Sequence, residues 1–240
     1  MLALAVLPAC DNDDDQPQPT AGDTVYTDIT YTTVYIDQQN NIKRYYQHNS
    51  QNQLAGFTRF ETVSADTVGR FDFDADSLLM YARYYCLNNN GYAYKHVGFD
   101  GLGIYTDSVL YSYDNQNRLT STNTFLGNGS TGYITNYEWE GNLIESFDTR
   151  HIEYTLQPLL VDVFRINDLG FDNTLSGINP SYHLANIYIP PAGPGGHAQT
   201  VADYGYTFTN QGYVSSLFTR TNFNTDTIKG FKEHFTYIVE

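Results

Sequence analysis

A short aromatic hairpin pattern recurs along this chain and restricts what it can fold into. In residues 111–119, aromatic side chains two positions apart are followed by a polar turn and then by Leu119. Side chains two apart share one face of a strand, and Asn and Asp favour turns. The same order recurs at 46–54 and 206–214, and with shorter turns at 71–78 and 137–143. Each copy predicts two antiparallel strands joined by a turn.

The spacing of the copies supports a repeated sheet. Leu54 and Leu78 are 24 residues apart (78 − 54), and Leu119 and Leu143 are again 24 apart (143 − 119). Two strands and two turns fill such a period. The 22 Tyr and 14 Phe, against 2 Met and 1 Trp, suit a pleated surface better than a helix. We therefore predict an all-β fold: an antiparallel up-and-down sheet, curved or barrel-like, of about ten to twelve strands.

One region breaks the repeat. We interpret 25–240 as a single β domain in which residues 157–200 form an irregular or partly helical insertion. Within it, residues 190–196 contain three Pro and three Gly, which predicts a mobile loop.

The N-terminal segment predicts a lipid anchor. Residues 1–9 are an apolar run, too short for a bilayer, which needs about 20 residues, but typical of the end of a signal peptide. The sequence around Cys10 resembles a lipobox, in which the peptide is cut before the cysteine and the thiol receives a diacylglycerol. Pro8 is uncommon there and no Lys or Arg precedes the run, so we expect Met1 to lie inside the true signal peptide or the sequence to be trimmed.

An acidic tether follows the cysteine. Residues 10–24 carry five acids and no base, together with Pro and Gln, which is typical of a solvated linker. An acidic cluster after a lipidated cysteine also resembles the surface-export signal of Bacteroides-type lipoproteins. The expected location is therefore the outer membrane, lipid-anchored and surface-exposed. Cys86 would then have no partner, and we expect it to be a small buried apolar residue.

These features together resemble a known family. The hairpin of 111–119, the Leu- and Asn-rich insertion and a last strand at 235–239 are similar to an uncharacterised family of Bacteroides putative lipoproteins, a domain of unknown function with a porin-like fold. The resemblance covers about residues 25–240. It implies a curved or barrel-like antiparallel sheet and no activity. The hairpin unit also resembles the YD repeat of large secreted bacterial shells, but this chain is too short and its repeats too irregular for such a shell.

The charge excludes some partners. The net charge is −15 and the isoelectric point is near 4.5. Binding to nucleic acid needs a Lys and Arg footprint that this chain lacks, and electrostatic adhesion to anionic lipid is equally disfavoured. We predict no nucleic-acid partner, and we interpret the acidic surface as a means of solubility.

No metal or cofactor is predicted. Asp72, Asp74 and Asp76 have the spacing of a calcium loop, but Ser77 replaces the required Gly and Arg83 stands where a bidentate Glu is needed. In a strand these three acids would line the solvent face. The six histidines contain no pair at metal-ligand spacing; they are His48, His96, His151, His183, His197 and His234.

No catalytic residue is predicted either. Residues 128–132 lack the first Gly of a nucleophile elbow and indicate a turn. Gly101 and Gly103 lack the third Gly and the helix of a phosphate loop. Glu138 and Glu140 would lie about 7 Å apart on a strand, within the range of a glycosidase pair, but any strand with alternating Glu places them so. We expect a protein that is not an enzyme.

The leading hypothesis is a monomeric, lipid-anchored, non-enzymatic binding or structural module whose ligand is a glycan or a protein. One alternative is a hydrolase of polysaccharides with unassigned carboxylates. Another is an integral outer-membrane pore, which the alternation of Tyr137 and Trp139 with Glu138 and Glu140 would permit. A lipid anchor is redundant for an integral barrel, so we favour a soluble sheet whose aromatic face is buried. Exposed tyrosines could stack on sugars, but their places in the hairpin favour the core.

Overall fold

The chain forms strands throughout the part that its computed structural model describes, which is residues 25–39, 41–141, 143–158, 182–189, 199–221 and 229–240. Within these ranges there are fifteen strands. They are β1 (Val25–Ile36), β2 (Ile42–His48), β3 (Leu54–Ser64), β4 (Thr67–Asp74), β5 (Leu79–Leu87), β6 (Ala93–Asp100), β7 (Tyr105–Tyr113), β8 (Leu119–Leu126), β9 (Thr131–Glu140), β10 (Leu143–Phe147), β11 (Arg150–Pro158), β12 (Tyr182–Ile189), β13 (Gln199–Phe208), β14 (Val214–Thr221) and β15 (Lys229–Val239). No helix in these ranges is long and apolar enough to cross a membrane.

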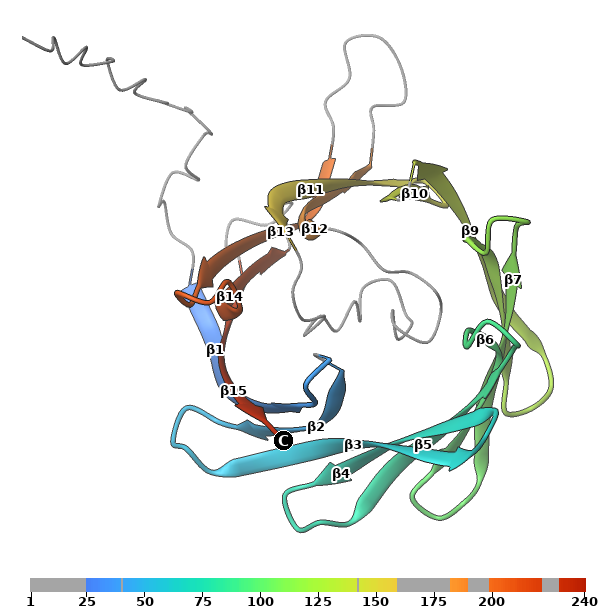
Figure 1. Ribbon diagram of the computed structural model, residues 1–240, viewed down its shortest axis with the longest axis horizontal. Coiled ribbons are helices and arrows are strands. Elements are labelled where there is room, and N and C mark those ends of the chain that lie inside the picture. The colour runs from blue at the N-terminus through green and yellow to red at the C-terminus, as the bar shows by residue number, and fades with distance from the viewer. Residues whose placement is uncertain (1–24, 40, 142, 159–181, 190–198, 222–228) are drawn as a thin grey trace, which may run out of the picture.

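The fifteen strands close into a barrel (Figure 1). Each strand pairs antiparallel with its neighbours in sequence, as the hairpin repeat predicts. The closing pair differs, because β1 and β15 run parallel. An odd number of up-and-down strands requires this, since the first and last strands then point the same way. The predicted all-β, up-and-down, barrel-like fold is confirmed, with more strands than the ten to twelve expected.

The difference in count has a local origin. Strand β12 and the start of β13 lie inside residues 157–200, where the sequence suggested an irregular or helical insertion. Instead, β12 pairs with both β11 and β13 and continues the wall of the barrel. Residues 159–181 and 190–198, including the loop predicted at 190–196, lie outside the described residues. Strand β10, of 5 residues, is the return strand of the hairpin predicted at 137–143.

The polar turns share one geometry. In the turn 114–118, the amide of Asp114 bonds the carbonyl oxygen of Arg118, the amide of Asn117 bonds the carbonyl oxygen of Asp114, and the Asp114 carboxylate accepts the amides of Gln116 and Arg118. The fourth residue is left-handed, as in a type I turn with a G1 bulge. Corresponding positive φ angles occur at Asn52, Ser77, Gly91, Gly103, Asn117, Gly129 and Gly212. These turns fix the register of the hairpins that the sequence predicted.

Aromatic side chains tie neighbouring strands together near one rim. The hydroxyl of Tyr113 donates to the carbonyl oxygen of Ala93 at 2.7 Å, and the indole Nε1 of Trp139 donates to that of Leu119 at 2.7 Å. Tyr154 and Tyr237 make equivalent bonds to the carbonyl oxygens of Ile144 and Val214. The second aromatic of the 111–119 and 137–143 repeats is thus a strand-to-strand link.

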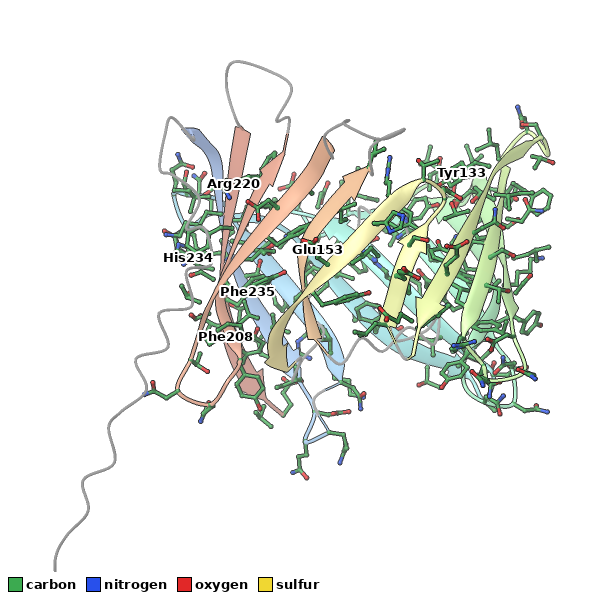
Figure 2. The ribbon with its side chains drawn as sticks, turned by 90° about the horizontal axis from the view of Figure 1, so that it is seen from above. Tyr133, Glu153, Phe208, Arg220, His234 and Phe235 are labelled. Atoms are coloured by element: carbon green, nitrogen blue, oxygen red, sulfur yellow. The ribbon has the colours of Figure 1, made fainter. Side chains whose placement is uncertain are left out.

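The wall of the barrel has an inner and an outer face. Figure 2 shows Phe235 pointing into the barrel and its neighbour His234 pointing outward. Because side chains alternate along a strand and Cα partners share a face, the register carries this assignment around the wall. Val34, Tyr45 and Tyr111 are thereby inner residues, and all three are buried.

Which face of the wall is apolar changes around the barrel. On β9 to β15 the inner face is mostly apolar, with Ile144, Phe147, Ile152, Ile187, Ala202 and Phe235 buried. The outer face of that arc carries Glu138, His151, Glu153, Asp203, Arg220, Lys232 and His234. Figure 2 shows Glu153 and Arg220 on this arc. On β1 to β7 the outer face is aromatic and the inner face carries charged and hydroxyl groups.

The outer aromatic residues form two rows of touching rings. One row joins Tyr35, Tyr46, Phe57 and Phe73, and the other joins Phe71, Tyr84, Phe99 and Tyr105. Aromatic side chains therefore occupy both faces of the sheet, which corrects the expectation of a single buried aromatic face. The rings of Phe57 and Phe73 stack at 4.5 Å with an interplanar angle of 9°. Their faces cover each other, so this pair offers edges rather than a flat platform for a sugar.

The barrel has two distinct rims. We call the rim where β1 and β15 begin the N-terminal rim, and the rim where they end the C-terminal rim. By alternation of direction, the turns 49–53, 75–78, 101–104, 127–130 and 148–149 lie at the N-terminal rim. The turns 65–66, 88–92, 114–118 and 209–213 lie at the C-terminal rim, as do residues 37–39 and Gly141. In Figure 2, Tyr133 lies toward the first rim and Phe208 toward the second.

Candidate functional site

Hydrogen-bonded polar side chains line the inner face from β2 to β7. We call this set the inner polar wall. Its members are Tyr45, Thr58, Arg70, Asp72, Tyr81, His96, Thr106, Asp107 and Tyr111. They form two clusters on adjoining strands.

Asp107 on β7 is the centre of the larger cluster. Its Oδ1 accepts hydrogen bonds from the hydroxyls of Tyr81 and Thr106, and its Oδ2 lies 3.3 Å from Nε2 of His96. The other ring nitrogen of His96, Nδ1, lies 2.7 Å from the hydroxyl of Tyr111. His96 is buried and bonded at both nitrogens, so β6 presents a fixed imidazole between two partners on β7.

The cluster depends on a glycine and a bulge. Tyr81 lies on β5 and Asp107 on β7, so their contact crosses the intervening strand β6. It crosses at Gly98, where an added Cβ would overlap both the Tyr81 hydroxyl and the Asp107 carboxylate. Thr106 has no Cα partner on β6, because the register shifts between Gly98 and Phe99. This bulge turns the Thr106 hydroxyl toward the same face as Asp107.

The environment fixes the ionisation of the cluster. Burial alone would raise the pKa of Asp107, but hydrogen bonds from His96, Tyr81 and Thr106 outweigh it and hold the pKa well below its ordinary value. Burial and the bond to Asp107 raise the pKa of Tyr81 above its ordinary value. At neutral pH the cluster therefore holds a carboxylate anion and a neutral phenol.

A second cluster lies on β2 to β4. The hydroxyl of Thr58 donates to Oδ1 of Asp72 at 2.6 Å, and Nε of Arg70 donates to the same oxygen at 3.1 Å. Nη2 of Arg70 lies 3.4 Å from the hydroxyl of Tyr45. The side chains of Arg70 and Asp72 are only 13% and 26% exposed, so this ion pair is largely shielded from solvent.

The two clusters meet at the β4–β5 boundary. Asp72 and Tyr81 are Cα partners there, as are Arg70 and Arg83. The guanidinium carbon of Arg83 lies 4.6 Å from the centre of the Tyr81 ring. The inner polar wall is thus a strip of two carboxylates, one guanidinium group, an imidazole and several hydroxyls, with the guanidinium of Arg83 beside it. Such a strip can bind groups that both donate and accept hydrogen bonds.

The three acids with calcium-loop spacing, Asp72, Asp74 and Asp76, lie in different environments. Asp72 belongs to the inner polar wall, which corrects the expectation that it lines the solvent face. Asp74 caps the turn 75–78 by accepting the amides of Asp76 and Leu78, and Asp76 is exposed at the turn. Within the described ranges, no group of three or more His, Cys, Asp and Glu side chains could hold a metal ion.

The other weighed motifs lie in turns or on the outer face. Residues 101–104 and 127–130 are turns with Gly103 and Gly129 at positive φ. The turn predicted at 128–132 is confirmed for 128–130, whereas Thr131 and Gly132 begin β9. Glu138 accepts a hydrogen bond from Ser146 on the outer face, and Glu140 is exposed at the end of β9. Neither is part of the inner polar wall.

The structure tests the prediction for one of the two cysteines. Cys86 is free, but it is half-buried on β5 rather than fully buried. It lies on the outer face of the wall, where its Cα partners are Thr67 and Lys95. Cys10 and the tether 10–24 lie outside the described residues, so lipidation of Cys10 stays a prediction, as do the boundaries 1–9 and 10–24.

The inner polar wall was not visible in the sequence reasoning. His96 is one of six scattered histidines, and nothing in the sequence around Asp107 predicts that it joins a cluster with His96. The relevant signal is weak: Gly98 stands inside a strand, which indicates close approach of another group or a bulge. Both occur here. No local pattern, however, announces a contact from Tyr81 to Asp107 across an intervening strand.

Fold and inner face together define a closed fifteen-stranded barrel with a polar strip along half of its inner wall. No protein-family model matches the chain, and no curated protein matches it. Among solved structures, it is similar to a porin-like protein from Bacteroides uniformis, with 14% identity and a TM-score of 0.47, over 79% of this chain and 87% of that one. A likeness at this level carries no argument about what this chain does.

Proposed function

We propose that this chain is a non-enzymatic binding barrel of the bacterial envelope, tethered to the outer membrane by a lipid on Cys10, with a hydroxyl-rich ligand such as a glycan at the inner polar wall. The wall carries the proposal. A buried polar group costs about 1–3 kcal/mol when its bonds are unmade, so an apolar filling is the cheaper way to pack an interior. On β9 to β15 the inner face is lined mostly by apolar side chains, whereas on β2 to β7 it carries the inner polar wall.

The outer charges argue against a barrel fully inserted in a bilayer. Arg59, Lys95 and Lys232 lie on the outer face within strands, and Asp203 forms an ion pair there with Arg220. An Arg or Lys facing lipid at the bilayer midplane costs about 2–4 kcal/mol. An envelope protein held by a lipid anchor avoids this cost.

A second candidate function is an integral pore. Strands β1 to β7 favour it, because they combine aromatic residues outside with polar residues inside, as membrane barrels do. A Cys10→Ala variant separates the two. Extraction of this variant by carbonate supports the tethered barrel, and retention in the membrane supports the pore.

The inner carboxylates do not support the hydrolase alternative. A glycosidase needs an acid of raised pKa beside a second carboxylate. The pKa of Asp107 is lowered, and its oxygens, like Oδ1 of Asp72, are already engaged by donors. We therefore propose binding without turnover.

The binding proposal is tested by titrating soluble oligosaccharides into the protein and into two charge-matched variants. Asp107→Asn changes the inner polar wall, whereas Glu140→Gln removes one charge from an exposed outer position. We expect Asp107→Asn to weaken binding by about tenfold or more, as loss of a charged hydrogen-bond partner does, and Glu140→Gln to leave it unchanged. Equal affinities for all three proteins, or hydrolysis of the sugar, would overturn the proposal.

The anchor is tested separately by the mass of the protein isolated from its native envelope. A diacylglycerol on a new N-terminal Cys10 is the expected result. An unmodified Cys10 in the mature chain would refute the anchor without affecting the binding test.

A further inference from the structure

Large apolar side chains are exposed along one rim of the barrel. Leu102 at the tip of the turn 101–104 is 87% exposed, Leu78 in the turn 75–78 is 62% exposed, and Ile104 is 60% exposed. Strand residues beside the same turns are also exposed: Met80, Leu126, Tyr133 and Ile134. All seven lie at the N-terminal rim.

The three turns involved are neighbours in space. They are the β4–β5, β6–β7 and β8–β9 turns, and each lies two strands from the next in the wall. The backbone of Gly101 lies against the carbonyl of Leu79, and that of Gly127 lies against the carbonyls of Tyr105 and Thr106. The exposed apolar side chains therefore lie on three neighbouring turns of one rim.

The opposite rim is different in character. Its described turns consist mainly of Asp, Asn, Gln and Gly, and contain no exposed large apolar side chain in the residues described. Its exposed apolar residues lie in strands, on β3, β6, β7 and β15; they are Val63, Tyr94, Leu110, Ile238 and Val239. The two rims therefore differ in their turns, which carry exposed apolar side chains at the N-terminal rim alone among the described residues.

The chain enters the barrel at the apolar rim. Val25 begins β1 there, and the fourteen residues from Asp11 to Thr24 join it to Cys10. Lipid on Cys10 and the apolar turns would thus meet the same surface. A diacylglycerol on Cys10 would carry two acyl chains, enough for stable attachment, so a contact of the rim with lipid would set the orientation of the barrel on the membrane.

We propose that the N-terminal rim docks on the lipid bilayer, with Leu78, Leu102 and Ile104 inserted into the interface. The barrel then stands on the membrane without spanning it, and the C-terminal rim faces away. The contact is apolar, because the chain carries a net charge of −15 and anionic lipid repels it. The inference rests on the proposed anchor only for the orientation of the tether.

Unlipidated full-length Cys10→Ala protein tests the rim without the anchor. A single reporter cysteine is placed at Leu102 or, as the matched control, at Gln116 on the opposite rim, with Cys86→Ser in both, and labelled with an environment-sensitive fluorophore. Vesicles of phosphatidylcholine are the probe. We expect a blue shift from the Leu102→Cys label and none from the Gln116→Cys label.

Variants then measure the contribution of the turns. Leu102→Ser with Ile104→Ser is expected to lower the vesicle partition coefficient by about tenfold or more, since two buried aliphatic side chains are lost. Asn115→Ser with Gln116→Ser should leave it unchanged. High salt should not weaken binding, and added phosphatidylglycerol should not strengthen it.

Several outcomes would overturn the proposal. They are a shift at both labels, no partitioning of the parent protein, salt-sensitive binding that needs phosphatidylglycerol, or a self-association that the Leu102→Ser, Ile104→Ser variant abolishes while vesicles have no effect. An absent lipid on Cys10 in the native protein would refute the anchor alone. The two failures are therefore distinguishable.

Discussion

At the scale of single residues, the polar contacts inside this barrel join side chains that are far apart in the sequence and belong to no recognisable motif. Asp107 has neighbours on β5 and β6 that are 26 and 11 residues away in the chain, and a glycine lets the first of them reach it. The cost of leaving such a carboxylate unpaired is larger than the gain from any one bond. The cluster is therefore most sensitive to changes that alter one partner alone.

Asp107→Asn is expected to make stability less dependent on acid. The folded pKa of Asp107 is lowered, so its contribution is present above the ordinary carboxyl pKa and is lost as pH falls below it. Between about pH 6 and pH 3, the free energy of unfolding should fall by about 1 kcal/mol more in the parent protein than in Asp107→Asn. Urea unfolding at each pH measures this, and parallel curves would contradict it.

Tyr113→Phe is expected to destabilise the fold by about 1 kcal/mol, because the carbonyl oxygen of Ala93 loses its donor while the ring stays in place. Burial raises the pKa of Tyr113, so the parent protein should also lose stability as pH rises above the ordinary phenol value of about 10. Tyr94→Phe at an exposed position is the control. Unfolding midpoints at pH 8 and above compare them.

At the scale of elements, the hairpin is the unit that the sequence specifies. Alternating aromatics indicated which side chains share a face of a strand, but not which face points inward, and the Asn- and Asp-rich segments located turns such as 49–53 and 114–118. Those interactions are local, which is why sequence reasoning found them. Strand β12 was missed because its side chains follow no aromatic repeat, and its place is set by pairing with β11 and β13. The inner polar wall follows no local pattern either, since its contacts join strands two apart, β5 with β7 and β2 with β4.

Gly91→Ala tests the turn geometry. Gly91 has φ of 81° and open space around its Cα, so the only penalty of a Cβ is conformational. We expect a loss of about 1–2 kcal/mol. Gly91→Asn should recover much of it, because Asn already holds this position at Asn52 and Asn117. Equal stability of the glycine and alanine proteins in denaturant titrations would show that the turn tolerates another conformation.

At the scale of the whole molecule, closure depends on two segments at opposite ends of the chain. Strands β1 and β15 are the first and last described strands along the chain, and no hairpin turn joins them to bring about their parallel pairing. It is held by packing of Val34 and Phe235 within one apolar cluster and by a hydrogen bond from Thr32 to Glu233. Sequence repeats predict neighbours, not which two edges meet, so the sequence left open whether the sheet closes.

A disulfide across the closing pair tests the barrel directly. Thr33 and Thr236 are Cα partners on the outer face. In a Cys10→Ser, Cys86→Ser background, Thr33→Cys with Thr236→Cys should form a bridge on mild oxidation, since partner Cα atoms lie within disulfide range. Thr33→Cys with Lys232→Cys, out of register, should not. Electrophoresis without reductant resolves both, and failure of the first pair to bridge would show an open sheet.

The parallel closing pair also determines when the barrel can close during synthesis. Strand β1 is the first described strand to leave the ribosome and β15 is the last, and neither can protect its edge until the other exists. Throughout synthesis and export the nascent sheet carries an unpaired edge that invites pairing with other chains. Closure of the barrel is thus a single late step. A chain that stops anywhere before β15 keeps an unpaired strand edge and is prone to aggregate.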